Sequence, residues 1–181
     1  MLWQTLQAKL SSVDMAGLAA AKDRPVVYID TRHQLLCCVS EQDSVSQYYP
    51  VSTSRFGIGQ QQGSFKTPIG IHRIAQKIGA HEPLGRVFKA REPTADICLS
   101  EDFKDDEEDV ITSRILWLEG LQPGLNCGAE VDTYQRYIYI HGTADEAHIG
   151  QPASIGCIRM RNTDVIRIFD QLAVGDLVVI E

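Results

Sequence analysis

Short apolar runs, separated by polar and turn-forming residues, recur through the first part of the chain. The runs at residues 26–29 and 35–39 flank the polar segment 30–33, and this arrangement predicts a β-hairpin. The run at residues 45–51 has the length of a third strand. Three consecutive strands with short connections predict an antiparallel meander.

Two further strands are predicted at residues 69–74 and 110–118, with a connection between them. Residues 78–109 are long and polar, and they end in five consecutive acidic residues at 105–109. Such a charge run is most often a solvated loop, and a calcium site would need alternating ligands, which this run lacks. We therefore expect residues 78–109 to form a connecting loop.

The chain begins with apolar residues at helical spacing. Leu2, Trp3, Leu6 and Leu10 recur at helical intervals among polar residues. Residues 2–20 are therefore predicted to form an amphipathic helix that packs on the main domain.

A second helix is predicted to start at Asn162, which has the chemistry of an N-cap. Asp164 supplies an acid in the first turn, and apolar residues follow at helical intervals. A closing strand is predicted at residues 177–180. Many short strands and few helices predict a mainly β domain over residues 25–181, preceded by a helical extension at residues 1–24.

Length and charge narrow the class of protein. A chain of 181 residues fits one domain and buries about 70% of its unfolded surface, enough for a core without disulfides. The net charge is −7, and no basic run or basic, aromatic-interleaved stripe is present, so nucleic acid is not an expected partner. No apolar stretch has the length of a membrane span, and the first residues lack the pattern of a secretory signal. We therefore expect a cytoplasmic protein.

The five cysteines do not form a recognisable framework. Cys37 and Cys38 are adjacent, and Cys98, Cys127 and Cys157 are scattered. An odd number of cysteines without paired spacing argues against disulfides and against structural zinc. Most of these thiols are expected to behave as small buried apolar groups.

Cys157 stands out because a histidine precedes it by sixteen positions. His141 ends an apolar run at residues 137–140, and Cys157 lies in a loop after Gly156. A thiol becomes a strong nucleophile as its thiolate, and a nearby imidazole that accepts the proton is the usual way to form one. Gly156 permits a tight turn whose amides could face an oxyanion. The pair is a candidate catalytic dyad for acyl transfer.

These residues resemble the signature of the L,D-transpeptidase catalytic-domain family. Its pattern is a His-Gly pair, a connection of this length, Ser/Thr-His-Gly-Cys, and an Asn or Arg shortly after; the matching residues here are His141, Gly142, Ser154, Gly156, Cys157 and Arg159. Ile155 occupies the position of the family's usual second histidine. The likeness continues upstream in residues 50–54 and 63–70 and covers roughly residues 25–181.

The resemblance implies a β-sandwich and a role for each matching residue. Cys157 would attack the substrate carbonyl, His141 would take the thiol proton, and the Gly142 carbonyl would orient the imidazole. Backbone amides near Gly156 and Cys157 would hold the oxyanion, with Ser154 shaping the loop. No metal or organic cofactor is implied.

Other residues have competing interpretations. Arg159 could hold a substrate carboxylate or simply solvate the start of the following helix. His148 is expected to face solvent more readily than substrate. A metal site built from His141, His148 and Cys157 is supported by ligand type alone. The glycines of residues 57–63 lack the following helix of a dinucleotide site and favour a loop.

The function expected from the resemblance is cleavage of peptidoglycan-derived tetrapeptides or muropeptides. Cys157 would form a thioester with loss of the terminal D-alanine. Without an export signal, soluble fragments returned for recycling are the expected substrates, so water would release a tripeptide and the protein would be an L,D-carboxypeptidase. The alternatives are an L,D-transpeptidase that forms cross-links and a non-catalytic peptide-binding module.

Overall fold

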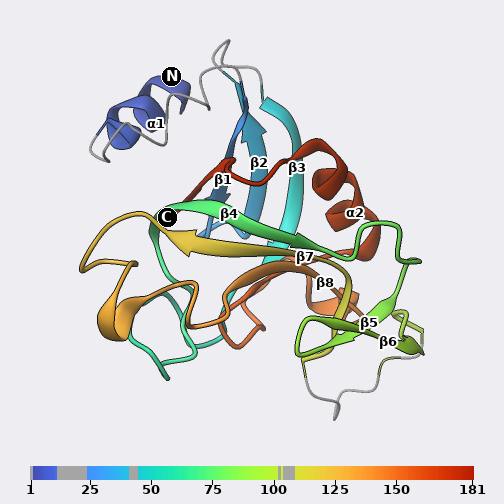
Figure 1. Cartoon of the computed structure of the whole chain (residues 1–181). Coiled ribbons are helices and arrows are strands. Elements are labelled where there is room, and N and C mark those ends of the chain that lie inside the picture. The colour runs from blue at the N-terminus through green and yellow to red at the C-terminus, as the bar shows by residue number, and fades with distance from the viewer. Residues whose placement is uncertain (1, 12–23, 41–44, 102, 104–108) are drawn as a thin grey trace.

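The computed structural model describes residues 2–11, 24–40, 45–101, 103 and 109–181 (Figure 1). Within these residues, ten strands form one sheet and two α-helices lie outside it. The strands are β1 (Val26–Asp30), β2 (Leu35–Val39), β3 (Val45–Ser52), β4 (Gly70–Ile78), β5 (Arg86–Lys89), β6 (Glu92–Ile97), β7 (Ile111–Gly120), β8 (Tyr139–Thr143), β9 (Ile158–Met160) and β10 (Leu177–Ile180). The α-helices are α1 (Leu2–Leu10) and α2 (Asn162–Gln171), and short 3-10 helices occur at Ala129–Val131 and Glu146–His148.

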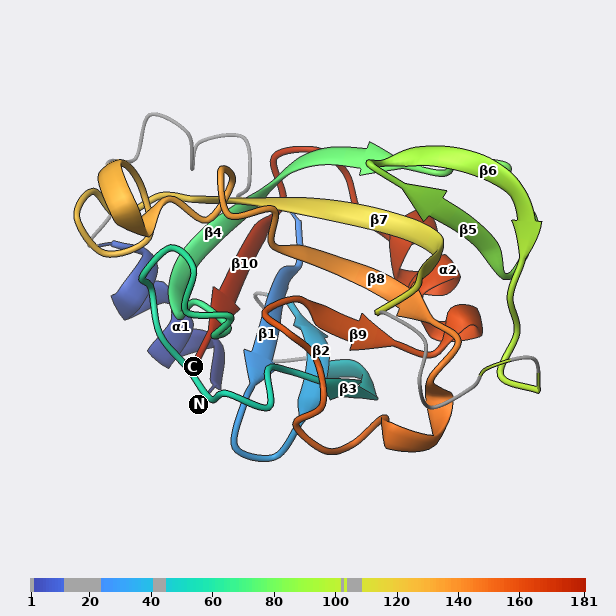
Figure 2. The ribbon, with the colours of Figure 1, turned by 90° about the horizontal axis from the view of Figure 1, so that it is seen from below.

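The sheet closes on itself through β7. The strand order is β4-β10-β1-β2-β3-β9-β8-β7-β5-β6, and β7 also pairs with β4. The β5–β6 hairpin is attached at the start of β7, through Val87 beside Thr112 and Phe88 beside Ile111. Figures 1 and 2 show β1, β2 and β3 running steeply across β4 and β7, so that the strands form two layers. The predicted mainly β fold is confirmed.

The main core lies between these layers and is covered by α2. Buried side chains of β1–β4 and β7–β10 form one cluster with Val165, Ile168 and Phe169 of α2 and with Leu172, its C-cap. These four positions are spaced i, i+3, i+4 and i+7, which places them on one side of a helix. The same spacing in the sequence predicted this helix, and its position is confirmed.

A second cluster fixes α1 to the outer face of the sheet. Trp3, Leu6 and Leu10 are buried against side chains of β1, β2, β4 and β10. Cys37 belongs to this cluster, whereas its neighbour Cys38 faces the main core. Successive side chains of a strand point to opposite faces, so the two thiols cannot share a partner. The first half of the predicted helix 2–20 is confirmed, and its second half lies outside the described residues.

Two sequence predictions are wrong. The segment at residues 78–109 contains strands β5 and β6, which form a hairpin instead of a plain connecting loop. It escaped prediction because β6 is exposed on both faces and has no alternation of apolar and polar residues. Asn162 is the first residue of α2 instead of its N-cap, which is Arg161. Most of the acidic run 105–109 lies outside the described residues.

None of the described helices has the length and apolar character needed to cross a membrane.

Candidate active site

The site is built on two parallel strands that bring distant residues together. Strands β8 and β9 pair in parallel, with Ile140 beside Ile158 and His141 beside Arg159. Cys157 directly precedes β9, so the register places it close to the start of β8. The backbone amide of Tyr139 lies 3.4 Å from the Cys157 sulfur.

His141 is held in one tautomer by its neighbour. Its Nδ1 lies 2.7 Å from the carbonyl oxygen of Gly142. A carbonyl oxygen only accepts hydrogen bonds, so Nδ1 carries the proton and Nε2 bears the lone pair. The side chain is 0% exposed, and Nε2 has no hydrogen-bond partner among the described residues. Burial lowers the pKa of His141, although Asp109 and the Gly142 carbonyl act in the opposite direction.

Cys157 is half-buried beside an aromatic cluster. Its sulfur accepts from the Tyr139 amide and lies 3.4 Å from the Tyr137 carbonyl oxygen, to which the thiol can donate. The side chain also packs against the cluster that contains Trp117 and Tyr139. Burial raises the pKa of Cys157 to about 12, and nearby Asp109 adds to this rise. The resting dyad is therefore a neutral thiol and a neutral imidazole.

This protonation state predicts how Cys157 reacts with iodoacetamide. We expect its alkylation to be at least about tenfold slower at neutral pH than that of an exposed peptide cysteine, because few thiols are ionised. The rate should rise steadily up to about pH 10 without a plateau, because the raised pKa lies above this range. Peptide mapping separates Cys157 from the other cysteines. A plateau that begins at acidic pH would show a thiolate–imidazolium pair and contradict this description.

The loop before Cys157 is fixed by hydrogen bonds within it. The Ser154 hydroxyl donates to the Cys157 carbonyl at 2.6 Å and accepts from the Gly156 amide at 3.2 Å. The Thr67 hydroxyl donates to the Gly156 carbonyl at 2.9 Å. Gly156 has a φ of 135°, which L side chains rarely adopt, and a Cβ there would lie 3.3 Å from Ile138. The turn that presents Cys157 therefore requires glycine.

Gly142 allows α2 to approach the dyad closely. A Cβ at Gly142 would lie 2.6 Å from the Thr112 carbonyl oxygen and 2.7 Å from the Asn162 side-chain oxygen. That Asn162 oxygen accepts from the Thr112 and Ser113 hydroxyls, and its amide group donates to the Thr143 carbonyl at 2.8 Å. Asn162 therefore ties α2 to β7 and β8 directly behind His141.

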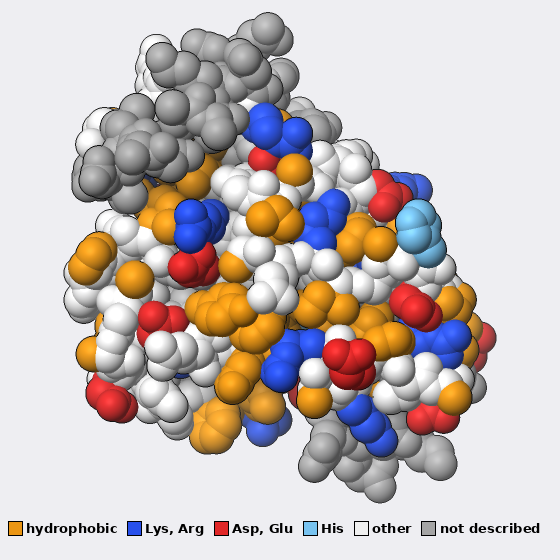
Figure 3. Space-filling view, viewed as in Figure 1, with side chains coloured by type: hydrophobic (Ala, Val, Ile, Leu, Met, Phe, Trp, Pro, Cys, Tyr) orange, Lys and Arg blue, Asp and Glu red, His pale blue; other side chains and the backbone are white. Residues whose placement is uncertain are grey.

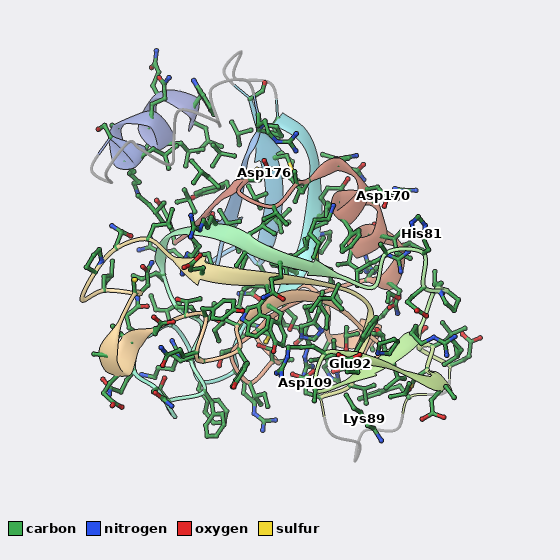
Figure 4. All side chains as sticks on the ribbon, viewed as in Figure 1. His81, Lys89, Glu92, Asp109, Asp170 and Asp176 are labelled. Carbon is green, nitrogen blue, oxygen red and sulfur yellow. The ribbon has the colours of Figure 1, made fainter. Side chains whose placement is uncertain are left out.

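Arg159 is buried between two carboxylates. Its Nε lies 2.8 Å from Asp109 and its guanidinium 3.2 Å from Asp145, and only 7% of the residue is exposed. Figure 4 labels Asp109 shortly before β7. A buried cation with two acidic partners is largely compensated. A substrate carboxylate bound by Arg159, as one of the sequence interpretations expects, would have to compete with these two acids.

His148 shares Asp145 with Arg159, each through a different carboxylate oxygen. Its Nδ1 is 2.6 Å from Asp145, and 48% of its side chain is exposed. A pocket of about 430 Å³ is lined by residues that include Arg55, Asp109, His148 and Arg159.

Within the described part of the chain, no three His, Cys, Asp or Glu side chains group closely enough to hold a metal ion.

Sequence reasoning missed the residues that support the site from outside its two motifs. Thr67 contacts the Gly156 loop, and Asp109 and Asp145 pair with Arg159. Thr67 lies in the Thr-Pro-Ile-Gly turn that carries the upstream resemblance, so a signal for it was present. The two acids had no signal, because their contacts depend on the tertiary fold.

Comparison with known proteins agrees with this geometry. The family model for the L,D-transpeptidase catalytic domain, YkuD, matches residues 24–180. The chain therefore belongs to the L,D-transpeptidase catalytic-domain family. No curated protein sequence matches significantly.

Several solved L,D-transpeptidases share the fold at low sequence identity. A protein from Xylanimonas cellulosilytica superimposes with a TM-score of 0.54 and 16% identity, covering 97% of this chain and 68% of that one. L,D-transpeptidase 3 of Mycobacterium tuberculosis, with a faropenem-derived adduct, gives a TM-score of 0.53 and 13% identity, covering 87% of this chain. This chain spans 60% of that protein and 58% of its Mycobacterium smegmatis relative. At these identities the likeness supports the fold alone.

Proposed function

We propose that this chain is an L,D-carboxypeptidase that removes the terminal D-alanine from peptidoglycan-derived tetrapeptides. Cys157 is the nucleophile, His141 is the general base, and the Gly142 carbonyl orients the base. The observation that carries the proposal is the unpartnered Nε2 of His141, a buried proton acceptor on the strand beside Cys157.

Acylation involves two proton transfers and the exchange of one carbon–nitrogen bond for a carbon–sulfur bond. The Cys157 sulfur attacks the carbonyl carbon between the diamino acid and D-alanine as its proton passes to Nε2 of His141. The neutral resting pair favours transfer during the attack over a preformed thiolate. The carbon–nitrogen bond then breaks, the imidazolium returns the proton to the leaving amine, and D-alanine departs from a thioester.

The developing oxyanion needs hydrogen-bond donors close to the sulfur. The Gly156 amide already donates to the Ser154 hydroxyl. We therefore assign the main donor role to the Cys157 amide, at the end of the turn that Gly156 permits. A single well-placed donor of this kind is worth about 3 to 4 kcal/mol in other acyl-transfer enzymes.

Hydrolysis is favoured over cross-linking by the residue at the position of the family's second histidine. Ile155 is 42% exposed and supplies an apolar side chain that cannot hydrogen-bond to an acceptor amine. Water is small enough to reach the thioester without a dedicated acceptor site. A hydrolase also needs no polymerised wall as acceptor. We therefore propose that the reaction takes place on soluble fragments in the cytoplasm. Cell fractionation would test this location.

Cross-linking is the second candidate, and it is favoured by the family itself. The matched family model and the similar structures are L,D-transpeptidases. A third candidate, a peptide-binding module without activity, is disfavoured by the presence of both dyad members with a free Nε2.

Product analysis separates these functions. Incubation with a diaminopimelate-containing tetrapeptide should yield tripeptide and D-alanine in equal amounts, with little dimer even at millimolar peptide, because Ile155 offers no polar contact to hold an acceptor amine. Mass spectrometry of the mixture measures all three products.

Dimer as the main product would establish the transpeptidase, and an unchanged tetrapeptide would favour the binding module.

A further inference from the structure

A second feature near Cys157 is an arginine stacked on an aromatic cluster. Arg91 lies in the two-residue turn between β5 and β6, and its guanidinium carbon lies 5.1 Å from the ring centre of Trp117 and 5.0 Å from that of Tyr137. Trp117 also stacks on Tyr134 at 4.1 Å and meets Tyr139 edge-on at 5.4 Å. Figure 3 shows hydrophobic side chains gathered across the middle of this face, with basic side chains beside them.

The aromatic cluster connects Arg91 to the reacting sulfur. Tyr139 donates its backbone amide to the Cys157 sulfur, and Tyr137 offers its carbonyl oxygen to the same sulfur. A hydrogen bond with the Tyr139 side chain raises the pKa of Arg91, whereas burial lowers it. Tyr137 and Tyr139 therefore each interact with both the Arg91 guanidinium and the Cys157 sulfur.

Arg91 differs from Arg159 in having no acidic partner among the described residues. Arg159 pairs with Asp109 and Asp145, and Arg136 donates to the backbone carbonyls of Gly59 and Lys66. Arg91 forms no ion pair with any described residue, although Glu92 follows it directly. Figure 4 labels Glu92 and Lys89, which flank the turn. Stacking leaves the N–H edges of a guanidinium free to bind a carboxylate through two hydrogen bonds.

The backbone of the turn indicates independently that Arg91 has a functional role. Ala90 has a φ of 48° and Arg91 a φ of 70°. Two-residue hairpin turns with two positive φ values strongly prefer asparagine, aspartate and glycine. An arginine in this conformation is not explained by the needs of the turn, and such local strain collects at functional positions.

We propose that Arg91 binds a free carboxylate of the peptide substrate at the rim of the Cys157 site. This inference rests on the proposed function, because it takes the stem tetrapeptide as substrate. Two carboxylates of that peptide have the required chemistry: the terminal carboxylate of D-alanine and the side-chain carboxylate of the diamino acid. Arg91 is thus a substrate-binding residue that selects anionic peptides.

The test combines variants of the hairpin with amidated peptides. Arg91→Asn keeps a residue that tolerates the positive φ, Arg91→Lys keeps a charge without the planar fork, and Lys89→Ala removes a neighbouring charge as the matched control. The steady-state constants kcat and KM are measured for the tetrapeptide, for its C-terminal amide and for the peptide amidated at the diamino acid. Thermal melting establishes that each variant is folded.

We expect Arg91→Asn to lower kcat/KM for the tetrapeptide by about 10- to 100-fold, mainly through KM, while Lys89→Ala changes it less than about twofold. Arg91→Lys should recover part of the loss. One amidated peptide should show the same loss with the wild-type protein and no further loss with Arg91→Asn, which identifies the carboxylate.

Other outcomes overturn the inference in distinguishable ways. If Arg91→Asn behaves like Lys89→Ala, or loses equally on all three peptides, Arg91 does not bind a carboxylate while the proposed function stands. If the wild-type protein cleaves none of the three peptides, the proposed function fails and this inference fails with it.

Discussion

Replacement of Cys157 by alanine is expected to abolish the release of D-alanine from the tetrapeptide. The thiol is the only covalent centre in the mechanism, and an alanine side chain cannot form the thioester. The fold should persist, because the change removes one sulfur atom that is hydrogen-bonded to the backbone of Tyr139 and Tyr137 and packs at the edge of the aromatic cluster. D-Alanine release measures the activity, and circular dichroism measures the fold.

Cys127→Ala is the matched control for this variant. Cys127 is a free, partly exposed cysteine like Cys157, but it lies outside the strands of the site. It should retain wild-type activity. Near wild-type turnover in Cys157→Ala would eliminate the proposed nucleophile.

Replacement of His141 by alanine is expected to lower kcat by roughly 10² to 10⁴, the usual contribution of a general base. The residue is fully buried, so the alanine variant leaves a cavity, and His141→Gln serves as a second variant of closer size. Glutamine cannot accept the proton at neutral pH, so it should lose activity to a similar extent. Activity is measured per folded protein, as determined from the melting curve.

His148→Ala is the control for the histidine. Its ring is half exposed, and its Nδ1 is hydrogen-bonded to Asp145. Its loss should therefore change kcat less than about twofold. If His141→Gln kept most of the wild-type activity, another group would have to accept the thiol proton.

The sequence predicted those elements whose own residues carry a clear apolar pattern. The hairpin of β1 and β2 followed from two apolar runs that flank a polar turn, and α2 followed from Val165, Ile168 and Phe169 at helical spacing. The β5–β6 hairpin could not be predicted in this way, because both faces of β6 meet solvent and its sequence carries no period. Its attachment depends on β7, which arrives later in the chain.

The sequence predicted those parts of the candidate site that lie within a local motif. The parallel pairing of β8 and β9 places His141 beside Arg159, two residues after Cys157. The two motifs in the sequence indicated that these residues belong to one site. The surroundings of Arg159 and Arg91 were not predictable, since Asp109, Asp145 and Trp117 reach them only through the folded sheet. Asn162 resembled a helix cap in sequence, but its buried oxygen binds β7 hydroxyls instead.

The resting state of the dyad has a consequence for selectivity. Burial holds Cys157 as a thiol and His141 as a neutral ring, so adventitious electrophiles meet a weak nucleophile. In the proposed mechanism, Cys157 is activated only when a substrate carbonyl is bound and Nε2 of His141 takes the thiol proton. This coupling favours acyl donors that are positioned beside the dyad.

The most direct test of the central claim is the intact mass of the protein after rapid acid quenching of a reaction with the tetrapeptide. We predict an adduct whose mass equals the tetrapeptide less D-alanine, located on Cys157 by peptide mapping and absent from Cys157→Ala. Release of D-alanine by the wild-type protein without such an adduct, or with the adduct on another residue, would contradict the mechanism.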